Sequence, residues 1–348
     1  MHVSPARPRL AVVSDYAWAT GGVEEFVVQL VRGAANAYEV DLVTWAGARA
    51  PDGGASSTCV EFGDPRDVVN VLESADAVVV VTSFNVRLLA RLAYECLVAR
   101  PRPCVVVVQT SGPSRAVASV AMQAGWLTAL AGRADAVVAV SDEVRLALAG
   151  TLDDRLLDRV QVIENASRLS SARRQRSTRR TVGFIGRPAP QKGYQMFERL
   201  VREVDDRRLS FVANTVSLPA PRILPGVTYS YGLDDAGLVG WFDAVDVLVA
   251  PYLRGDGLPL AVLEALKCGV PVIGFDSPGL GSLLRRHGQT VLPARFEDLL
   301  GAVNGWAVGA NATTDTNPGL VRSWPGQIDA YLDLVEAART HERVRCGP

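Results

Sequence analysis

The sequence predicts an α/β protein made of two doubly wound domains, and three observations support that prediction. Near-continuous valine runs at 76–82, 103–110 and 135–141 are typical of strands buried on both faces of a parallel sheet. Apolar residues at helical spacing lie between these runs, as the alternation of strands and helices in such folds requires. The chain has 348 residues, which is long enough for two cores of ordinary size.

The first domain is expected over residues 1–167. It opens with a strand, Leu10 to Ser14, followed by a loop in which Gly21 and Gly22 precede a helix. A double glycine is a weak signal, because a plain tight turn before a packed helix gives the same pattern. Further strands are expected at 39–45, 76–82, 103–110 and 135–141, and helices near 85–99 and 115–131.

The second domain is expected over residues 181–325, after a linker at 168–180. The linker is rich in Ser and Arg, and such runs are usually solvated, although a basic patch for anionic lipid or nucleic acid is the alternative. The stretch from Asp246 to Phe275 then predicts a strand, a glycine loop, a helix starting at Leu258 and another strand. Ligands of open parallel sheets bind at such loops, beside the carboxyl ends of the strands.

Composition argues against several classes of protein. The formal net charge is -1, whereas nucleic-acid-binding proteins usually have a basic excess. The five cysteines include no pair at CxxC spacing, which favours a reduced, cytoplasmic protein. The sequence indicates neither a signal peptide nor an apolar run long enough to span a membrane, and peripheral membrane contact stays open.

Charged residues flank two loops of the second domain. Arg187 and Lys192 follow the predicted strand TVGFIG, where cations can neutralise a diphosphate. Asp256 and Glu264 bracket the other loop, whose helix amides form an anion site, and Glu264 could accept hydrogen bonds from a ribose diol. Each residue alone could equally be an ordinary surface residue. Together they predict a nucleotide-bearing ligand, which we expect in a cleft between the domains.

Two segments of the second domain resemble one known family. GFIGRPAPQKGYQMFERLV and WFDAVDVLVAPYLRGDGLPLAVLEALKCGVPVI are similar to the strand-GR-loop-KG-helix and E-x7-E regions of retaining GT-B glycosyltransferases, family 4 (glycosyl transferases group 1). The first domain agrees more loosely, through its GG loop, DAVVAVS and VIENASR. The last segment, SWPGQIDAYLDLVEA, resembles the family's terminal helix, so the resemblance implies that residues 326–348 pack back on the N-terminal domain.

The resemblance also implies roles for individual residues. Arg187 and Lys192 would hold the donor diphosphate and, with Asp256, act in catalysis, while Glu264 would hold the ribose hydroxyls. The residues implied in donor binding are Gly21, Gly22, Gly186, Arg187, Lys192, Gly257, Leu258 and Glu264, and those on the acceptor side are Asp15, Gln109, Thr110 and Ser111.

Three departures from the family pattern matter. Asp256 stands in place of the first Glu of the E-x7-E pair and is one methylene shorter, which can alter the donor sugar that is held. Gln109 replaces a histidine that many members have. The segment 165–168 reads Asn-Ala-Ser-Arg where members often read NGVD. The latter two departures bear on the acceptor side more than on donor binding.

Histidine is scarce, and this bears on the mechanism. The three histidines are His2, His287 and His341, so a histidine base in the N-terminal domain is not expected. A retaining mechanism needs no side-chain base, because the leaving phosphate can take the acceptor proton while cations stabilise its charge. No His, Cys and carboxylate cluster has ligand spacing, so neither a metal nor a cofactor is expected.

The sequence therefore predicts a retaining glycosyltransferase that moves a sugar from a nucleoside diphosphate-sugar to a hydroxyl of a small polar acceptor. The expected setting is secondary-metabolite (antibiotic) or envelope-glycan biosynthesis. The protein is expected to be a monomer or homodimer and to bind no nucleic acid. Two alternatives stay open. One is a pseudo-glycosyltransferase or nucleotide-sugar 2-epimerase of the same fold, and the other is a non-catalytic nucleotide-sugar-binding partner of another glycosyltransferase.

Overall fold

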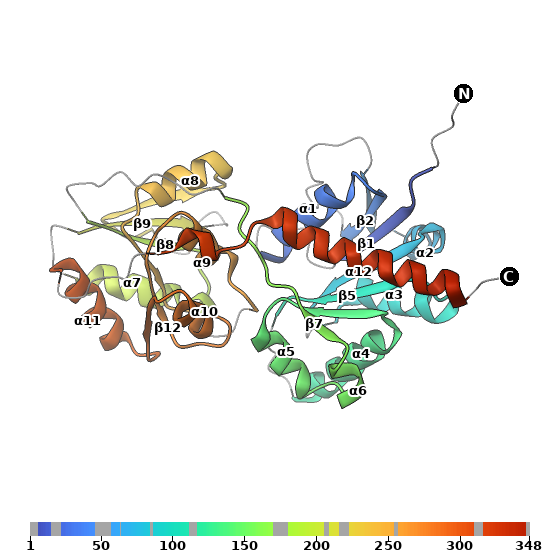
Figure 1. Cartoon of the computed structure of the whole chain (residues 1–348). Coiled ribbons are helices and arrows are strands. Elements are labelled where there is room, and N and C mark those ends of the chain that lie inside the picture. Colours follow the sequence, from blue (N-terminus) through green and yellow to red (C-terminus); the bar gives the residue numbers. More distant parts are fainter. Residues whose placement is uncertain are drawn as a thin grey trace, which may run out of the picture. The chain divides into compact units, whose positions relative to one another are not determined.

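The computed structural model describes residues 6–14, 22–45, 57–62, 64–83, 86–110, 117–169, 180–204, 209–215, 223–253, 257–309 and 316–345. The chain forms two compact units (Figure 1). The first comprises Met1–Asn165 together with Trp324–Pro348, and the second comprises Ala166–Ser323. Each unit is a parallel sheet with helices, so the predicted α/β fold with two doubly wound sheets is confirmed.

The first unit contains a seven-stranded parallel sheet in the order β3-β2-β1-β4-β5-β6-β7. Every residue of β4 and β5 is buried, because these valine-rich strands lie inside the sheet and are covered on both faces. The order reverses between β1 and β4. The strands are β1 (Arg9–Ser14), β2 (Glu39–Trp45), β3 (Ser57–Phe62), β4 (Ala77–Thr82), β5 (Cys104–Val108), β6 (Ala136–Ala139) and β7 (Val160–Val162).

Helix α12 (Trp324–Arg345) ends the first unit and packs along α1 (Gly22–Ala34), as Figure 1 shows. The Phe26 ring of α1 lies 5.8 Å from that of Trp324 and 5.2 Å from that of Tyr331. The other helices of this unit are α2 (Pro65–Ser74), α3 (Leu88–Ala99), α4 (Val117–Arg133), α5 (Asp142–Ala149) and α6 (Asp154–Leu157). Polar side chains cap three of them: Asp64, Ser141 and Asp153 each accept a backbone hydrogen bond in the first turn.

The second unit contains a six-stranded parallel sheet in the order β10-β9-β8-β11-β12-β13. This order reverses between β8 and β11, which makes their boundary the switch point of the sheet, and the loops after these two neighbouring strands lie at its carboxyl edge. The strands are β8 (Arg180–Ile185), β9 (Leu209–Thr215), β10 (Val227–Tyr231), β11 (Val247–Ala250), β12 (Val272–Phe275) and β13 (Thr290–Leu292). The helical elements are η1 (Pro190–Lys192), α7 (Tyr194–Glu203), α8 (Asp235–Asp243), α9 (Leu260–Lys267), α10 (Leu280–Arg286), α11 (Phe296–Ala307) and η2 (Pro318–Leu320).

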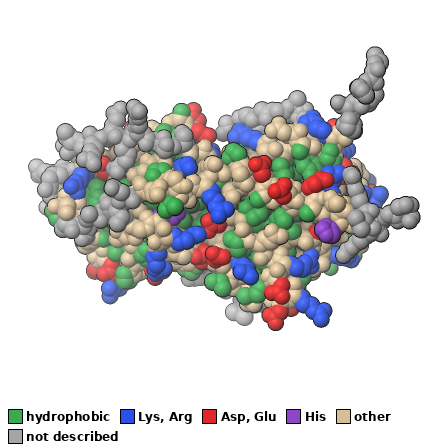
Figure 2. Space-filling model, in the orientation of Figure 1, with side chains coloured by type: hydrophobic (Ala, Val, Ile, Leu, Met, Phe, Trp, Pro, Cys, Tyr) green, Lys and Arg blue, Asp and Glu red, His purple; other side chains and the backbone are tan. Residues whose placement is uncertain are grey.

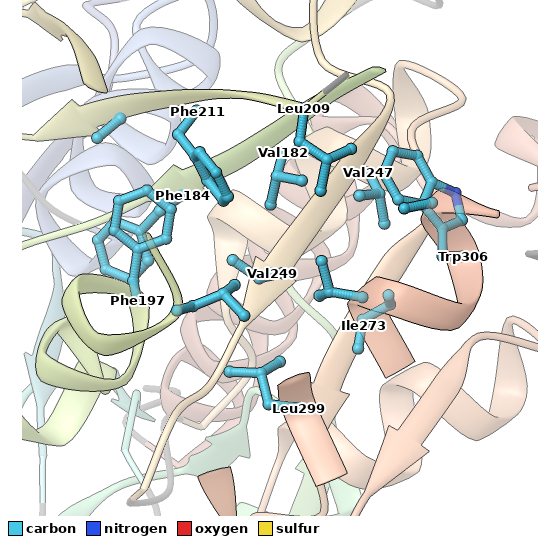
Figure 3. Close-up of a cluster of buried hydrophobic side chains, with 14 of the residues drawn as sticks. Val182, Phe184, Phe197, Leu209, Phe211, Val247, Val249, Ile273, Leu299 and Trp306 are labelled. Atoms are coloured by element: carbon cyan, nitrogen blue, oxygen red, sulfur yellow. The ribbon is translucent and has the colours of Figure 1, made fainter. Parts of the chain in front are cut away.

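Helices α7 and α11 cover one face of the second sheet and form its core (Figure 3). Phe197 of α7 stacks on Phe184 of β8, with ring centroids 5.2 Å apart. Leu299 and Trp306 of α11 pack in the same cluster as Val249. This packing fixes β8 and β11, and with them the loops at their carboxyl ends.

Two expectations about segment boundaries need comment. Helix α9 begins at Leu260 rather than at Leu258, because Pro259 biases the residue before it toward extended backbone. At the expected linker, Arg168 and Leu169 are part of the second unit, and Arg180 begins β8. Residues 170–179 lie outside the described residues.

The surface has no dominant sign of charge on the face shown in Figure 2, where basic and acidic side chains are interspersed. This agrees with the formal net charge of -1. Among the helices that the structure describes, none is both long enough and apolar enough to cross a membrane.

Candidate functional site

The loop after β8 is shaped by two glycines. Gly186 has φ +141 and its amide donates to the carbonyl of Asn214, which carries the chain out of the sheet. Gly193 has φ +66, and a β-carbon there would lie 1.8 Å from the carbonyl oxygen of Pro251. Only glycine fits this position, because L-residues avoid that backbone conformation and any side chain would meet the backbone after β11. The loops after β8 and β11 are therefore in direct contact.

These two loops also share a hydrogen bond and a cation–π contact. The amide of Leu253 donates to the carbonyl of Gln191 over 3.0 Å. The ammonium of Lys192 lies 4.3 Å from the centre of the Tyr252 ring. Tyr252 is buried, and its hydroxyl donates to the carbonyl of Ile185 over 3.4 Å. Lys192 is thus held at the point where the strand order reverses, which is where open sheets of this kind bind ligands.

Arg187 lies on the same loop, directly after Gly186, and its side chain is exposed. Lys192 is only partly exposed. The structure therefore places both predicted cations on one loop beside the switch point, with different degrees of exposure. Tyr252, which orients Lys192, was not predicted. Its only sequence signal is an aromatic residue directly after a strand and a proline.

The loop after β11 leads to α9. Gly257 and Leu258 are buried and lie just before the first turn of this helix. The first backbone amides of a helix lack intrahelical partners and attract anions, so this end of α9 suits a phosphate group. Asp256, the third residue expected here, lies outside the described residues.

Glu264 lies in the second turn of α9 and is 7% exposed. Its Oε1 lies 3.4 Å from Nε of Arg168, and Nη1 of Arg168 lies 3.2 Å from Oδ1 of Asp235, the first residue of α8. Arg168 is thus placed between two helices of the second unit. Sequence reasoning assigned Arg168 to a solvated linker and missed this ion pair.

Several tyrosines lie near β10, which is an edge strand of the second sheet. The hydroxyls of Tyr194 and Tyr229 are 2.8 Å apart, and the rings of Tyr229 and Tyr231 stack with centroids 6.2 Å apart. Burial, followed by the hydrogen bond to Tyr229, raises the pKa of Tyr194. Tyr194 is therefore a neutral hydrogen-bonding group throughout the physiological range.

In the first unit, Gln109 and Thr110 directly follow β5. Gln109 is buried and accepts a hydrogen bond from Nδ2 of Asn165 over 3.3 Å. Nε2 of Gln109 and Oδ1 of Asn165 are both buried, and neither has a hydrogen-bond partner among the residues that the structure describes. If the nitrogen and oxygen of both amides are exchanged, one donor and one acceptor are again left unsatisfied. The pair therefore has one unsatisfied donor and one unsatisfied acceptor in either orientation of the amides.

The other predicted residues of the first unit are less informative. Gly22 is the first residue of α1 and is exposed. Asp15, Gly21 and Ser111 lie outside the described residues. Among the residues that the structure describes, no three His, Cys, Asp or Glu side chains gather as metal ligands would.

Comparisons with known proteins find similarity in sequence and in fold. Residues 179–305 match the family model described as glycosyl transferases group 1. A phosphatidyl-myo-inositol mannosyltransferase from Propionibacterium freudenreichii subsp. shermanii is 26% identical over 96 residues. That alignment spans 27% of this chain and 25% of the mannosyltransferase, so only a quarter of this relative is matched.

Solved structures extend the similarity to both units. Sucrose-phosphate synthase from Thermosynechococcus elongatus has a TM-score of 0.70 at 14% identity, covering 98% of this chain and 100% of that one. HepE of Anabaena in complex with UDP-glucose has a TM-score of 0.72 at 13% identity, covering 93% of this chain and 99% of that one.

The two parallel sheets and these neighbours define the class: the chain has the two-domain GT-B fold of glycosyltransferases. Within that class, residues 179–305 match the family model of glycosyl transferases group 1. The resemblance predicted from the two segments of the second domain is therefore confirmed.

Proposed function

We propose that the protein is a glycosyltransferase that moves a sugar from a nucleoside diphosphate-sugar to a hydroxyl group, with retention of the anomeric configuration. One observation supports this most strongly. The loop that holds Lys192 and the loop that leads into α9 are joined at the switch point of the second sheet. A cation and the first amides of a helix at this position suit a diphosphate.

Each part of the donor has a proposed partner. Lys192 and Arg187 hold the diphosphate from one loop, and the amides of Gly257 and Leu258 approach it from the other. Glu264 accepts the ribose hydroxyls. The UDP-glucose bound to HepE, a protein of the same fold, supports a nucleotide-sugar as donor.

The proposed reaction uses no side-chain base. The bond from the anomeric carbon to the leaving phosphate oxygen breaks, the bond to the acceptor oxygen forms on the same face, and the acceptor proton passes to the leaving phosphate. Lys192 and Arg187 stabilise the charge that develops on the diphosphate. The two histidines in the described part of the chain lie elsewhere: His287 at the end of α10 and His341 in α12. Retention is tested by the anomeric configuration of the product in a proton NMR spectrum.

A small polar acceptor with a neutral hydroxyl is the proposed co-substrate. Within the described residues, the buried side chains of Gln109 and Asn165 leave one donor and one acceptor unsatisfied, which is the pattern that a hydroxyl complements once these atoms are accessible. The mannosyltransferase relative is named for an inositol-bearing acceptor, which supports a polyol hydroxyl here. We propose secondary-metabolite or envelope-glycan biosynthesis as the setting, in the cytoplasm and without a metal. Transfer unchanged by EDTA would support the absence of a metal requirement.

The donor assignment is tested by binding and kinetics. A thermal-shift panel of nucleoside diphosphates and their sugars identifies the base, because a ligand at a hundred times its Kd stabilises a protein by about 2.7 kcal/mol. Arg187→Ala and Glu264→Ala are then expected to raise the donor KM or to slow transfer. Arg285→Ala, which removes an exposed arginine paired with Asp276, is the matched control. Unchanged transfer and donor KM in both site variants would refute the assignment.

A further inference from the structure

Arg168 joins two helices at the carboxyl edge of the second sheet. Its Nη1 lies 3.2 Å from Asp235 at the start of α8, and its Nε lies 3.4 Å from Glu264 in α9. Helix α8 follows β10, and α9 follows β11. The guanidinium therefore connects the elements that follow two different strands of one sheet.

The backbone around Arg168 is also connected to helix α9. Ser167 forms a parallel bridge with Ser323, so the segment carrying Arg168 lies beside the segment that ends the second unit. Lys267, at the end of α9, donates to the carbonyl of Val321 over 2.9 Å. Helix α9 is thus tied to these two neighbouring segments at its last residue by Lys267, and in its second turn by Arg168.

The Arg168 contact differs from an ordinary surface ion pair. The side chain of Arg168 is 24% exposed and that of Glu264 is 9% exposed. The exposed pair of Arg285 and Asp276, with side chains 57% and 49% exposed, is of the kind that contributes little to stability. A buried carboxylate that loses a cation partner has less of its charge compensated, so Arg168 contributes to fixing where the Glu264 carboxylate lies.

The ion pair is compatible with ligand binding by the same carboxylate. The contact of 3.4 Å is longer than an aligned charge-assisted hydrogen bond, which measures about 2.7–2.9 Å. A carboxylate offers roughly four acceptor positions, so Glu264 can accept hydroxyl hydrogens while it faces Arg168. Arg168 then orients the carboxylate without occupying its whole capacity.

From this arrangement we propose that Arg168 is a positioning residue for the nucleoside part of the donor. It holds Glu264 toward the ribose diol and ties α9 to α8, and it thereby sets the preference for ribose over deoxyribose. The inference rests on the proposed function, since it assumes that a nucleoside diphosphate binds at α9. It separates the site into a diphosphate part governed by Lys192 and a nucleoside part governed by Arg168.

The experiment compares two affinity ratios by titration calorimetry. UDP, GDP and ADP are each measured beside the 3′-deoxy analogue and the monophosphate, with wild type, Arg168→Ala, Arg168→Lys and Lys192→Ala. We expect Arg168→Ala to lower the ratio of the affinity for the ribonucleotide to that for its 3′-deoxy analogue by about tenfold or more. This is the effect of losing one charged hydrogen bond, here the bond between the Glu264 carboxylate and the ribose hydroxyl. Its ratio of diphosphate to monophosphate affinity should stay within about twofold of wild type. Lys192→Ala should show the reverse pattern, and Arg168→Lys should restore part of the ribose preference.

The possible failures are distinguishable. A wild-type protein that binds none of the nine nucleotides refutes the proposed function and this inference with it. A wild-type protein that prefers ribose, with an Arg168→Ala variant that keeps the same preference, refutes this inference alone. Equal loss in both ratios also refutes it, because that outcome indicates a general structural effect. If Arg168→Ala does not fold, Asp235→Asn replaces it, because the Asp235 side chain is 60% exposed.

Discussion

Gly193→Ala tests whether the contact between the loops after β8 and β11 supports the site. The new β-carbon would lie 1.8 Å from the Pro251 carbonyl oxygen and 2.7 Å from its carbon. These are backbone atoms, so no change of rotamer relieves the clash. The two loops must separate, and the hydrogen bond from Leu253 to Gln191 is then lost.

The cost has two parts that a control can separate. A non-glycine residue in the left-handed region costs about 1–2 kcal/mol, and overpacking typically adds about 1–3 kcal/mol. Gly226 has φ +80, and a β-carbon there would meet nothing within 4 Å. The free energy of unfolding should therefore fall by only the first part, about 1–2 kcal/mol, in Gly226→Ala. In Gly193→Ala it should fall by both parts, about 2–5 kcal/mol.

Urea unfolding of the full chain, followed by circular dichroism, measures both variants, and titration calorimetry measures nucleoside diphosphate binding. Displacing Lys192 by about 1 Å should reduce donor affinity tenfold or more in Gly193→Ala, and Gly226→Ala should bind as wild type does. Equal midpoints for the two variants would refute the steric argument. Unchanged binding by a destabilised Gly193→Ala would show that the contact between the loops does not position Lys192.

Two further predictions concern buried polar groups. Asn165→Leu should destabilise the protein by about 1–3 kcal/mol, because Gln109 loses its one described side-chain partner. The double variant with Gln109→Met should lose less stability than the sum of the losses in the two single variants. Additive losses in urea unfolding would contradict this prediction. Because the pKa of Tyr194 is raised in the folded state, its contribution to stability is fully present below the ordinary pKa of 10 and is lost as the pH rises above that value. Tyr194→Phe should therefore show a shallower fall in the urea midpoint above pH 10, and an identical slope would contradict the assignment.

The valine runs predicted the sheets well because burial on both faces needs only a local pattern of residues. β4 and β5 lie where that pattern placed them, and each is fully buried. The same holds for the loop after β8, where the two glycines and Lys192 are close in sequence. The apolar pattern predicts a start of α9 at Leu258, two residues before the observed start, because that pattern takes no account of Pro259.

Partners supplied by distant segments were not predictable in the same way. Arg168 reaches Glu264 because Ser167 pairs with Ser323, and no residue pattern within either segment predicts that pairing. Gln109 is a departure from the family pattern and Asn165 begins the segment that resembles NGVD, but the contact between them requires β5, β6 and β7 to lie in order in one sheet. Asp256 and Gly21 stay predictions, since the described residues do not include them.

The two segments that resemble the family each contain a loop followed by a helix, and a phosphate site of that kind is formed by residues that are close in sequence. The nucleoside part, as proposed here, depends on a side chain from another segment, which no motif within 246–275 includes. Arg168 stands where members of the family often have an acidic residue, and an acidic residue there would repel Glu264 rather than hold it. The E-x7-E pattern alone predicts a role for Glu264 without Arg168, which the structure places beside it.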